Sequence, residues 1–190
     1  MSFLDKLAGA IDKNSSFVCV GLDPDPELMP VGMGVLDFNR AIVEATSDLV
    51  CAYKPNLAFY EALGIDGMTA LLETVRLIPP DVPVIADAKR GDIGNTARAY
   101  ARALFDYFGF DACTVNPYLG SDAVAPFLQY REKGIFILCR TSNSGAVDFQ
   151  SLRCETPDGI RSTSPGPASI RPGPVITSTL PCTTCSNSPR

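Results

Sequence analysis

The charged stretch Asp87-Ala-Lys89-Arg90-Gly91-Asp92 holds the residues best suited to chemistry in this sequence. Asp87 and Lys89 end an apolar run and lie two residues apart, so on a β-strand their side chains share one face, with Cβ atoms roughly 7 Å apart. Gly91 lets the chain turn, so Asp92 can approach the same space or a neighbouring subunit. The spacing predicts acid–base chemistry by lysine and aspartate.

Lys54 and Asp23 extend this set, because each ends another apolar run at an equivalent position. Alternating cations and anions in a water-poor mouth keep one another ionised, since each charge offsets the desolvation of its neighbours. A second interpretation stays open, in which the charges form a structural ion-pair network at the rim of the fold. The sequence has no histidine, which excludes Ser-His and Cys-His nucleophile pairs and leaves acid–base chemistry to Lys, Asp, Glu, Tyr or Cys.

Short apolar runs with the length of β-strands alternate with segments of helical spacing. The five runs span 17–23, 50–54, 83–89, 112–116 and 134–140. The four helical segments span 38–49, 68–75, 97–108 and 124–128. Strands separated by single crossover helices must be parallel, which leaves a doubly wound open sheet or a (β/α)8 barrel.

The placement of the charges favours the barrel. The first three strands deliver Asp23, Lys54 and Lys89 at the same end of one face, as at the mouth of a barrel, where strand ends converge. The turn over 21–26 lacks the GxGxxG pattern of a dinucleotide-binding sheet. We predict an α/β protein with an incomplete (β/α)8 TIM barrel, about five strands and four crossover helices, in residues 1–159.

The composition changes abruptly after residue 159. Residues 160–190 contain six Pro, two Gly, six Ser and five Thr, with three Arg and no acidic residue. Such a segment buries too little apolar surface to fold, so we predict a disordered Pro/Ser/Thr-rich tail. We interpret this composition as the product of translation in a shifted reading frame or of a damaged gene end.

Charge and hydropathy exclude several kinds of partner. With 16 Lys and Arg against 21 Asp and Glu, the chain has a net charge of −5 and no basic field to hold nucleic acid or an anionic membrane. No apolar stretch is long enough for a membrane span, and the start does not have the pattern of a signal peptide, so we expect a cytoplasmic protein. Four of the seven cysteines lie in apolar runs, which predicts buried reduced thiols at Cys19, Cys51, Cys113 and Cys139.

Five segments together resemble orotidine 5′-phosphate decarboxylase, and their sequences are most similar to its bacterial long-chain branch. They are 20–24 (Val-Gly-Leu-Asp-Pro), 53–56 (Tyr-Lys-Pro-Asn), 87–96 (Asp-Ala-Lys-Arg-Gly-Asp-Ile-Gly-Asn-Thr), 114–120 (Thr-Val-Asn-Pro-Tyr-Leu-Gly) and 140–143 (Arg-Thr-Ser-Asn). The resemblance covers roughly residues 1–155. It implies a TIM barrel, usually a homodimer, that converts orotidine 5′-monophosphate to UMP and CO2 in pyrimidine biosynthesis, without metal or organic cofactor.

The same resemblance implies catalytic roles. Lys89 would donate a proton to C6 of the pyrimidine, and Lys54, Asp87 and Asp92 would complete a charged tetrad. Loss of CO2 leaves a carbanion at C6 that the ring delocalises poorly, so a cation is needed at that point. An ammonium group stabilises the carbanion and then protonates it.

Binding roles follow in the same way. Asp23 and Thr96 would contact the ribose, Ser142 would contact the pyrimidine, and Asp92 with Thr96 would reach into the partner subunit's site. Asn116 could line the pocket or only mark a turn before Pro117. By contrast, we expect Tyr60 to be exposed at the start of the second helix and Arg90 to lie at the surface.

A complete barrel needs on the order of 250 residues, so three strands would be missing. In the family these strands supply the Gln and Arg that grip the phosphate and the lid over the nucleotide. Two alternatives remain beside the decarboxylase: an inactive truncated fragment, and a Mg²⁺-dependent decarboxylase of a sugar-phosphate β-keto acid from the same barrel group.

Overall fold

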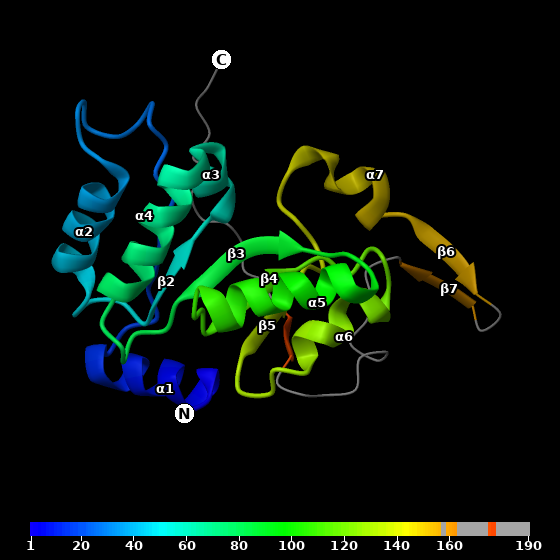
Figure 1. The fold of residues 1–190 in the computed structure, drawn as a ribbon. Coiled ribbons are helices and arrows are strands. Elements are labelled where there is room, and N and C mark those ends of the chain that lie inside the picture. Colours follow the sequence, from blue (N-terminus) through cyan, green and yellow to red (C-terminus); the bar gives the residue numbers. More distant parts are fainter. Residues whose placement is uncertain (157–158, 163–174, 178–190) are drawn as a thin grey trace, which may run out of the picture.

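The computed structural model describes residues 1–156, 159–162 and 175–177. All five predicted strands of residues 1–159 are confirmed, each shorter than its apolar run. They are β1 (Cys19–Leu22), β2 (Ala52–Pro55), β3 (Ile85–Arg90), β4 (Ala112–Val115) and β5 (Gly134–Ile137). β1 pairs with β2, β3 with β4 and β4 with β5, all in parallel (Figure 1). Two isolated parallel bridges, Tyr53 to Val84 and Asn56 to Asp87, join β2 to β3.

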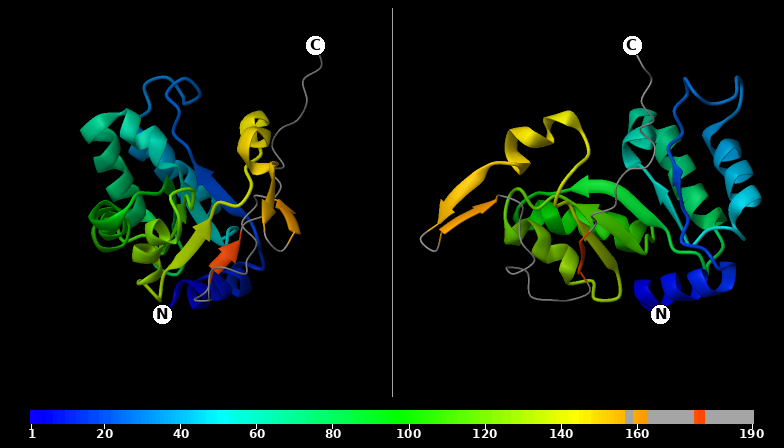
Figure 2. Two further views of the ribbon diagram at one scale, coloured as in Figure 1. Left: turned by 90° about the vertical axis from the view of Figure 1, so that its right-hand side faces the viewer. Right: turned by 180° about the vertical axis from the view of Figure 1, so that it is seen from behind.

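The strand order confirms the choice of a barrel section over a doubly wound sheet. The five strands follow one another in space as they do in the chain, whereas a doubly wound sheet reverses its order at a switch point. Figure 2 shows the crossover helices α4, α5 and α6 on one side of the strands. The carboxyl ends of all five strands therefore lie along one rim, where the candidate residues were expected.

The four predicted helices are also present. They are α2 (Val35–Thr46), α4 (Gly64–Leu77), α5 (Gly94–Arg102) continued by the π-helical turn η1 (Ala103–Tyr107), and α6 (Ser121–Leu128). Their apolar faces pack on the outer face of the strands in a core that contains Leu71, Phe105 and Phe127. The start of the second helix at Tyr60 falls in a separate short helix, α3 (Leu57–Ala62), and the short elements η2 (Ser144–Ala146) and α7 (Val147–Gln150) were not predicted.

A further helix that was not predicted, α1 (Phe3–Asn14), lies beneath the amino-terminal ends of the strands (Figure 1). Ser2 and Asp5 form a capping box at its start. Phe3 is buried against a small apolar cluster of the strands that includes Ala52, Ile85 and Ala112. α1 thus closes the end of the barrel section opposite the charged rim.

Tyr60 is buried, so the expectation of exposure was wrong. Its side chain lies in α3 and is 0% exposed, and its hydroxyl donates a hydrogen bond to the Leu22 carbonyl at 3.1 Å. The Asn39 amide, itself buried, donates to Tyr60 Oη at 3.0 Å and to Thr74 Oγ1 at 2.9 Å. This network ties two helices and α3 to the end of β1, a contact between residues 38 positions apart in the chain that local sequence does not reveal.

The cysteines follow the prediction in part. Cys51 and Cys113 are buried free thiols, and burial raises the pKa of Cys113 to about 12. Cys139 is half-buried and Cys19 is exposed, which corrects the expectation for these two. Cys19 lies on β1, which pairs only with β2 among the described strands, so no described strand pairs with its other edge. Within the described residues, no helix is long and apolar enough to cross a membrane.

Part of the predicted tail is described. β6 (Arg153–Thr156) and β7 (Gly159–Ser162) form an antiparallel hairpin, so the predicted boundary at 159 falls inside β7. β8 (Val175–Thr177) pairs in parallel with β5. Residues 160–162 and 175–177 are thus extended where disorder was expected, and Val175 and Ile176 are of the β-branched type that favours strands. The rest of the predicted tail, 163–174 and 178–190, lies outside the described residues.

The contact between α1 and the strands generates a stability prediction. A Cβ atom at Gly134 would lie 2.4 Å from Phe3 Cδ1 and 2.9 Å from the Ala112 Cβ atom. We expect Gly134→Ala to lower the free energy of unfolding by about 1–3 kcal/mol through overpacking. Gly9→Ala is the matched control, because nothing lies within 4 Å of its Cβ position in α1. It should raise stability by about 0.5–1 kcal/mol through helix propensity. Denaturant unfolding of both variants measures this, and a loss at Gly9 equal to that at Gly134 would contradict the packing argument.

Candidate active site

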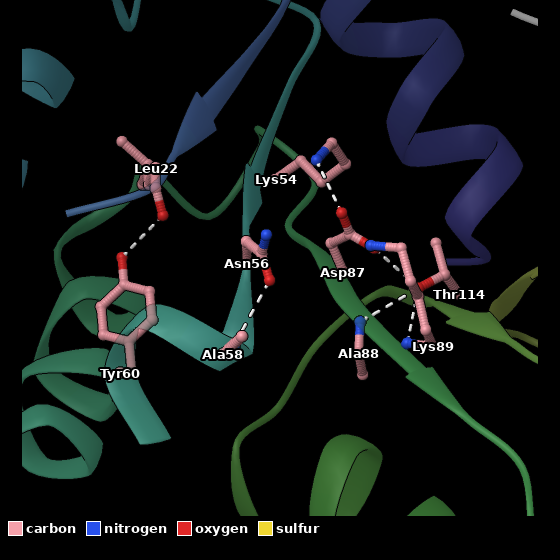
Figure 3. A network of polar contacts seen from close by, with 9 residues as sticks. All are labelled: Leu22, Lys54, Asn56, Ala58, Tyr60, Asp87, Ala88, Lys89 and Thr114. Carbon is pink, nitrogen blue, oxygen red and sulfur yellow. Dashed lines mark hydrogen bonds and ion pairs between the residues drawn. The ribbon is translucent and has the colours of Figure 1, made fainter. Parts of the chain in front are cut away.

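Three predicted residues meet at the carboxyl ends of β2 and β3. Lys54 Nζ lies 3.0 Å from Asp87 Oδ2, and Lys89 Nζ lies 2.6 Å from Asp87 Oδ1 (Figure 3). The Asp87 side chain is only 11% exposed, whereas those of Lys54 and Lys89 are 35% and 48% exposed. The result is a carboxylate held between two ammonium groups that remain accessible from the open side of the rim.

The charge of Asp87 is set by a competition between burial and its cationic neighbours. Burial acts to raise the pKa of this carboxyl group, but the hydrogen bond from Lys89 and the positive charge of Lys54 outweigh it. The pKa of Asp87 therefore lies below its ordinary value of 3.8. At neutral pH the cluster holds a fixed anion with a cation on each side.

The backbone at Lys89 departs from the regular alternation that the sequence predicted. Lys89 has a φ of 48°, in the left-handed region, and the pairing of β3 with β4 shifts register between Ala86 and Arg90. The Thr114 hydroxyl on β4 bridges this irregular segment, and it donates to Asp87 Oδ1 at 3.0 Å. Thr114 lies in the segment 114–120 that resembles the family, but the resemblance implies no role for it. The signal in the sequence that could have indicated this contact is its position two residues after Ala112, which places both side chains on the same face of the strand.

Arg90 is less exposed than expected. Its guanidinium pairs with Glu61 of α3 and lies over the Tyr100 ring of α5, 5.2 Å from the ring centre. The side chain is 25% exposed. Arg90 thus connects α3 and α5 around the end of β3.

Gly91 allows a close approach between the ends of two strands. A Cβ atom at Gly91 would lie 2.5 Å from the Asn116 carbonyl oxygen, which no side chain could tolerate. The Asn116 N–H donates to the Arg90 carbonyl at 2.7 Å across the same contact. The need for glycine here comes from packing and not from the turn conformation that the sequence analysis proposed.

The fourth residue of the predicted tetrad, Asp92, stands apart from the other three. It is half-buried, and its Oδ1 accepts a hydrogen bond from the Ile93 N–H at 2.7 Å. No ion pair joins it to Lys54 or Lys89 within the described part of the chain. Thr96 follows in the first turn of α5 and is exposed. Both residues follow the end of β3, and neither contacts the lysine cluster among the described contacts.

The remaining predicted binding residues lie along the same rim, each directly after a strand or in the loop beyond it. Asp23 follows β1 and is exposed, and Ser142 is exposed in the loop after β5. Asn116 follows β4, and its Oδ1 accepts a hydrogen bond from the Tyr118 N–H at 3.0 Å. The structure brings none of these three side chains into contact with the lysine cluster among the described contacts.

A cavity of about 660 Å³ opens beside the ends of β4 and β5. Its lining includes Asn116 and Tyr118 after β4, and Leu138, Phe149 and Gln150 from the segment after β5. The Gln150 side chain accepts a hydrogen bond from the Thr141 N–H at 2.7 Å and so holds the loop after β5 against α7. Asn116 thus stands before Pro117 and lines this cavity, whose lining does not include the lysine cluster, so its role in a substrate pocket stays a prediction.

Comparison with known proteins identifies the family. The sequence model of the orotidine 5′-phosphate decarboxylase / HUMPS family matches residues 16–161. The chain belongs to this family. An orotidine 5′-phosphate decarboxylase of Dehalococcoides mccartyi is 62% identical over 155 residues, which cover 82% of this chain and 57% of that protein. An orotidine 5′-phosphate decarboxylase of Thermomicrobium roseum is 57% identical over 157 residues, which cover 80% of this chain and 56% of that protein.

Solved structures of the decarboxylase family agree with the fold. The structure of Leishmania donovani OMP decarboxylase has a TM-score of 0.74 and 42% identity, and the match covers 81% of this chain and 60% of that one. The structure of the Methanocaldococcus jannaschii enzyme in complex with the inhibitor BMP has a TM-score of 0.53 and 27% identity, covering 70% and 56%. The chain thus spans little more than half the length of the decarboxylases that it matches, and the incomplete TIM barrel is confirmed.

The pKa of Asp87 generates a prediction on stability and pH. Its carboxyl group has a lower pKa in the folded chain than in the unfolded one, so unfolding takes up protons in this range. The stabilisation is present above the unfolded pKa and is lost as the pH falls through the folded one. Asp87→Asn should be less stable at neutral pH, where two lysines lose their counter-ion, and its stability should fall less from about pH 5 to about pH 2. Urea unfolding from about pH 7 to about pH 2 measures the free energy of unfolding of the wild type and of Asp87→Asn. If the two free energies change with pH in parallel, Asp87 is not the group with the lowered pKa.

Proposed function

We propose that this chain supplies the charged half of an orotidine 5′-monophosphate decarboxylase site and that, with the strands that complete the barrel, it forms UMP and CO2. The observation that carries the proposal is the Lys54, Asp87 and Lys89 cluster, which lies at the carboxyl ends of parallel strands in a member of this family. Active sites of such barrels lie at this end. The substrate is a small molecule, and we place the reaction in the cytoplasm.

The proposed reaction breaks one bond and forms one. The bond between C6 of the pyrimidine and the carboxylate carbon breaks, CO2 leaves, and the electron pair stays on C6. The Lys89 ammonium, 48% exposed and therefore reachable, stabilises that pair and transfers a proton to C6. Solvent then returns a proton to the lysine amine. Overall, one orotidine 5′-monophosphate and one proton give one UMP and one CO2.

Asp87 and Lys54 make this arrangement possible. Asp87 holds Lys89 by its Oδ1 atom and Lys54 by its Oδ2 atom, so the two ammonium groups are kept on opposite sides of one carboxylate. Because Asp87 is largely buried and hydrogen-bonded on both oxygens, its orientation is fixed before substrate arrives. Asp92 would complete the tetrad, and Asp23, Thr96, Asn116 and Ser142 would bind the nucleotide.

The test compares two proteins. One, the joined protein, carries residues 1–155 followed by the part of the Dehalococcoides mccartyi relative that lies beyond the match, and the other is the unchanged 190-residue chain. The joined protein should release CO2 from carboxyl-labelled orotidine 5′-monophosphate and form UMP, with a rate that EDTA leaves unchanged. A rate that requires Mg²⁺ and a sugar-phosphate β-keto acid would support the other barrel enzyme. An inactive joined protein with a native melting transition would overturn the proposal. UMP from the joined protein alone would mark the 190-residue chain as an incomplete catalytic unit.

The proposed proton donor generates a kinetic prediction. Lys89→Ala in the joined protein should lower kcat by roughly 10²–10⁴-fold, because general acid catalysis contributes this much, with a smaller change in UMP affinity. Lys13→Ala is the control, since Lys13 pairs with Asp81 at the surface, 2.7 Å away, and 60% of its side chain is exposed. Steady-state assays and UMP titration measure both. Normal turnover by Lys89→Ala would remove this residue from the mechanism.

A second prediction concerns the subunits. We propose that the complete barrel is a homodimer in which Asp92 and Thr96 act in the partner subunit's site, which accounts for their separation from the cluster. Inactive Lys89→Ala and inactive Asp92→Ala joined proteins, mixed and allowed to exchange subunits, should regain activity, because hybrid dimers hold one intact site. Absence of recovery after subunit exchange has been verified by native mass spectrometry would show that Asp92 acts within its own subunit.

A further inference from the structure

We propose that Thr114 is a positioning residue that fixes both ends of Lys89, its backbone through the N–H groups of Ala88 and Lys89 and its ammonium through Asp87. The consequence for the rate rests on the proposed function, whereas the consequence for the geometry of Lys89 does not. One hydroxyl group on β4 makes all three contacts (Figure 3).

The first step concerns the backbone. The register of β3 and β4 is regular as far as Ala86 and Cys113, and pairing resumes at Arg90 and Val115. Three residues of β3 thus lie opposite the single residue Thr114. The Ala88 and Lys89 N–H groups lose their places in the strand ladder, and Thr114 Oγ1 accepts hydrogen bonds from both, at 3.0 and 2.9 Å.

The second step concerns the conformation of Lys89. A φ of 48° is unfavourable for a residue with a Cβ atom, so the surroundings must impose it. The hydrogen bond from the Lys89 N–H to Thr114 Oγ1 is made in that conformation. Thr114 therefore compensates part of the strain that turns the lysine side chain back toward Asp87.

The third step concerns the side-chain end. A hydroxyl group has one proton and two lone pairs. Because both lone pairs of Thr114 Oγ1 accept backbone N–H groups, its proton is left for Asp87 Oδ1, 3.0 Å away. That same carboxylate oxygen holds Lys89 Nζ at 2.6 Å. The direction of the hydroxyl is thus determined, and with it the orientation of the carboxylate that holds the ammonium.

The need for such a residue follows from the lysine itself. Lys89 is 48% exposed and has a flexible four-carbon side chain, so packing does not fix its ammonium. A displacement of about 1 Å at a catalytic group can cost on the order of 10²-fold in rate. Fixing the Cα end and the Nζ end through one hydroxyl restricts the side chain without burying it.

The test uses the 190-residue chain in four forms, wild type and the variants Thr114→Ser, Thr114→Ala and Thr114→Val. Serine keeps the hydroxyl, and alanine differs from serine by the hydroxyl alone, so this pair decides the result if the valine variant does not fold. Amide hydrogen exchange at Ala88 and Lys89 should be about tenfold faster in the alanine and valine variants and unchanged in the serine variant. The side-chain ¹⁵Nζ resonance of Lys89 should shift in the same two variants only.

Thr74→Val is the matched control. Its buried hydroxyl also accepts one hydrogen bond and donates another, but it lies in α4, in contact with Asn39 and Ala70. This variant should lose stability and leave the Lys89 signals as in the wild type. Unchanged exchange at Ala88 and Lys89 in Thr114→Ala, or equal Lys89 shifts in Thr114→Ala and Thr114→Ser, would overturn the proposal.

The kinetic arm uses the joined protein described above. Thr114→Ala should lower kcat by roughly 10- to 100-fold with KM within about threefold, and Thr114→Ser should restore most of the rate. A wild-type joined protein that folds but forms no UMP would overturn the proposed function, and the exchange and ¹⁵Nζ data would still decide the positioning role. Equal turnover of the alanine and serine variants in an active joined protein would show that Thr114 does not act through Lys89.

Discussion

The carboxylate of Asp87 is the group on which the described site depends. A buried anion is costly unless cations and hydrogen-bond donors compensate it, and here one oxygen faces Lys54 while the other receives Lys89 and Thr114. Each of these partners comes from a strand end, so the pairing requires β2, β3 and β4 to be adjacent, with the register shift between β3 and β4 that places Thr114 beside Asp87. The electrostatic requirement of one side chain thus links the chemistry to the topology.

The two ends of β2, β3 and β4 have different roles, since the amino-terminal end packs against α1 and the carboxyl-terminal end carries the polar residues of the site. On one face, the amino-terminal positions Ala52, Ile85 and Ala112 are apolar and are covered by Phe3 of α1. Two residues further along each strand, the same face carries Lys54, Asp87 and Thr114. Because side chains alternate along a strand, a step of two residues moves from the sealed end of the barrel section to its open rim. α1 makes this division possible by closing the lower end.

The open rim also explains why the predicted nucleotide contacts are exposed. Asp23 and Ser142 follow the first and last of the five strands, β1 and β5, which lie furthest from the cluster along the rim. The decarboxylases to which this chain is similar have more than two fifths of their length outside the match. In a closed barrel the first and last strands of this section would be joined through that additional chain, which would bring the rim residues around a common centre.

Local sequence determined the five strands, the four crossover helices and the charged residues at the rim, because periodicity and strand-end charge are properties of neighbouring residues. A spacing of two predicted that Asp87 and Lys89 meet, although the left-handed backbone at Lys89 makes the contact in place of regular alternation, and parallel connectivity required Lys54 to come from another strand. Tertiary structure alone decided the role of Thr114, which exists because β3 and β4 shift register over three residues. It also decided the burial of Tyr60, through a hydrogen bond to a carbonyl on β1, and the need for glycine at 91, through the carbonyl of Asn116. These features depend on atoms that lie 25 to 38 residues apart in the chain, or on the packing of strand ends, and no local pattern encodes such distances.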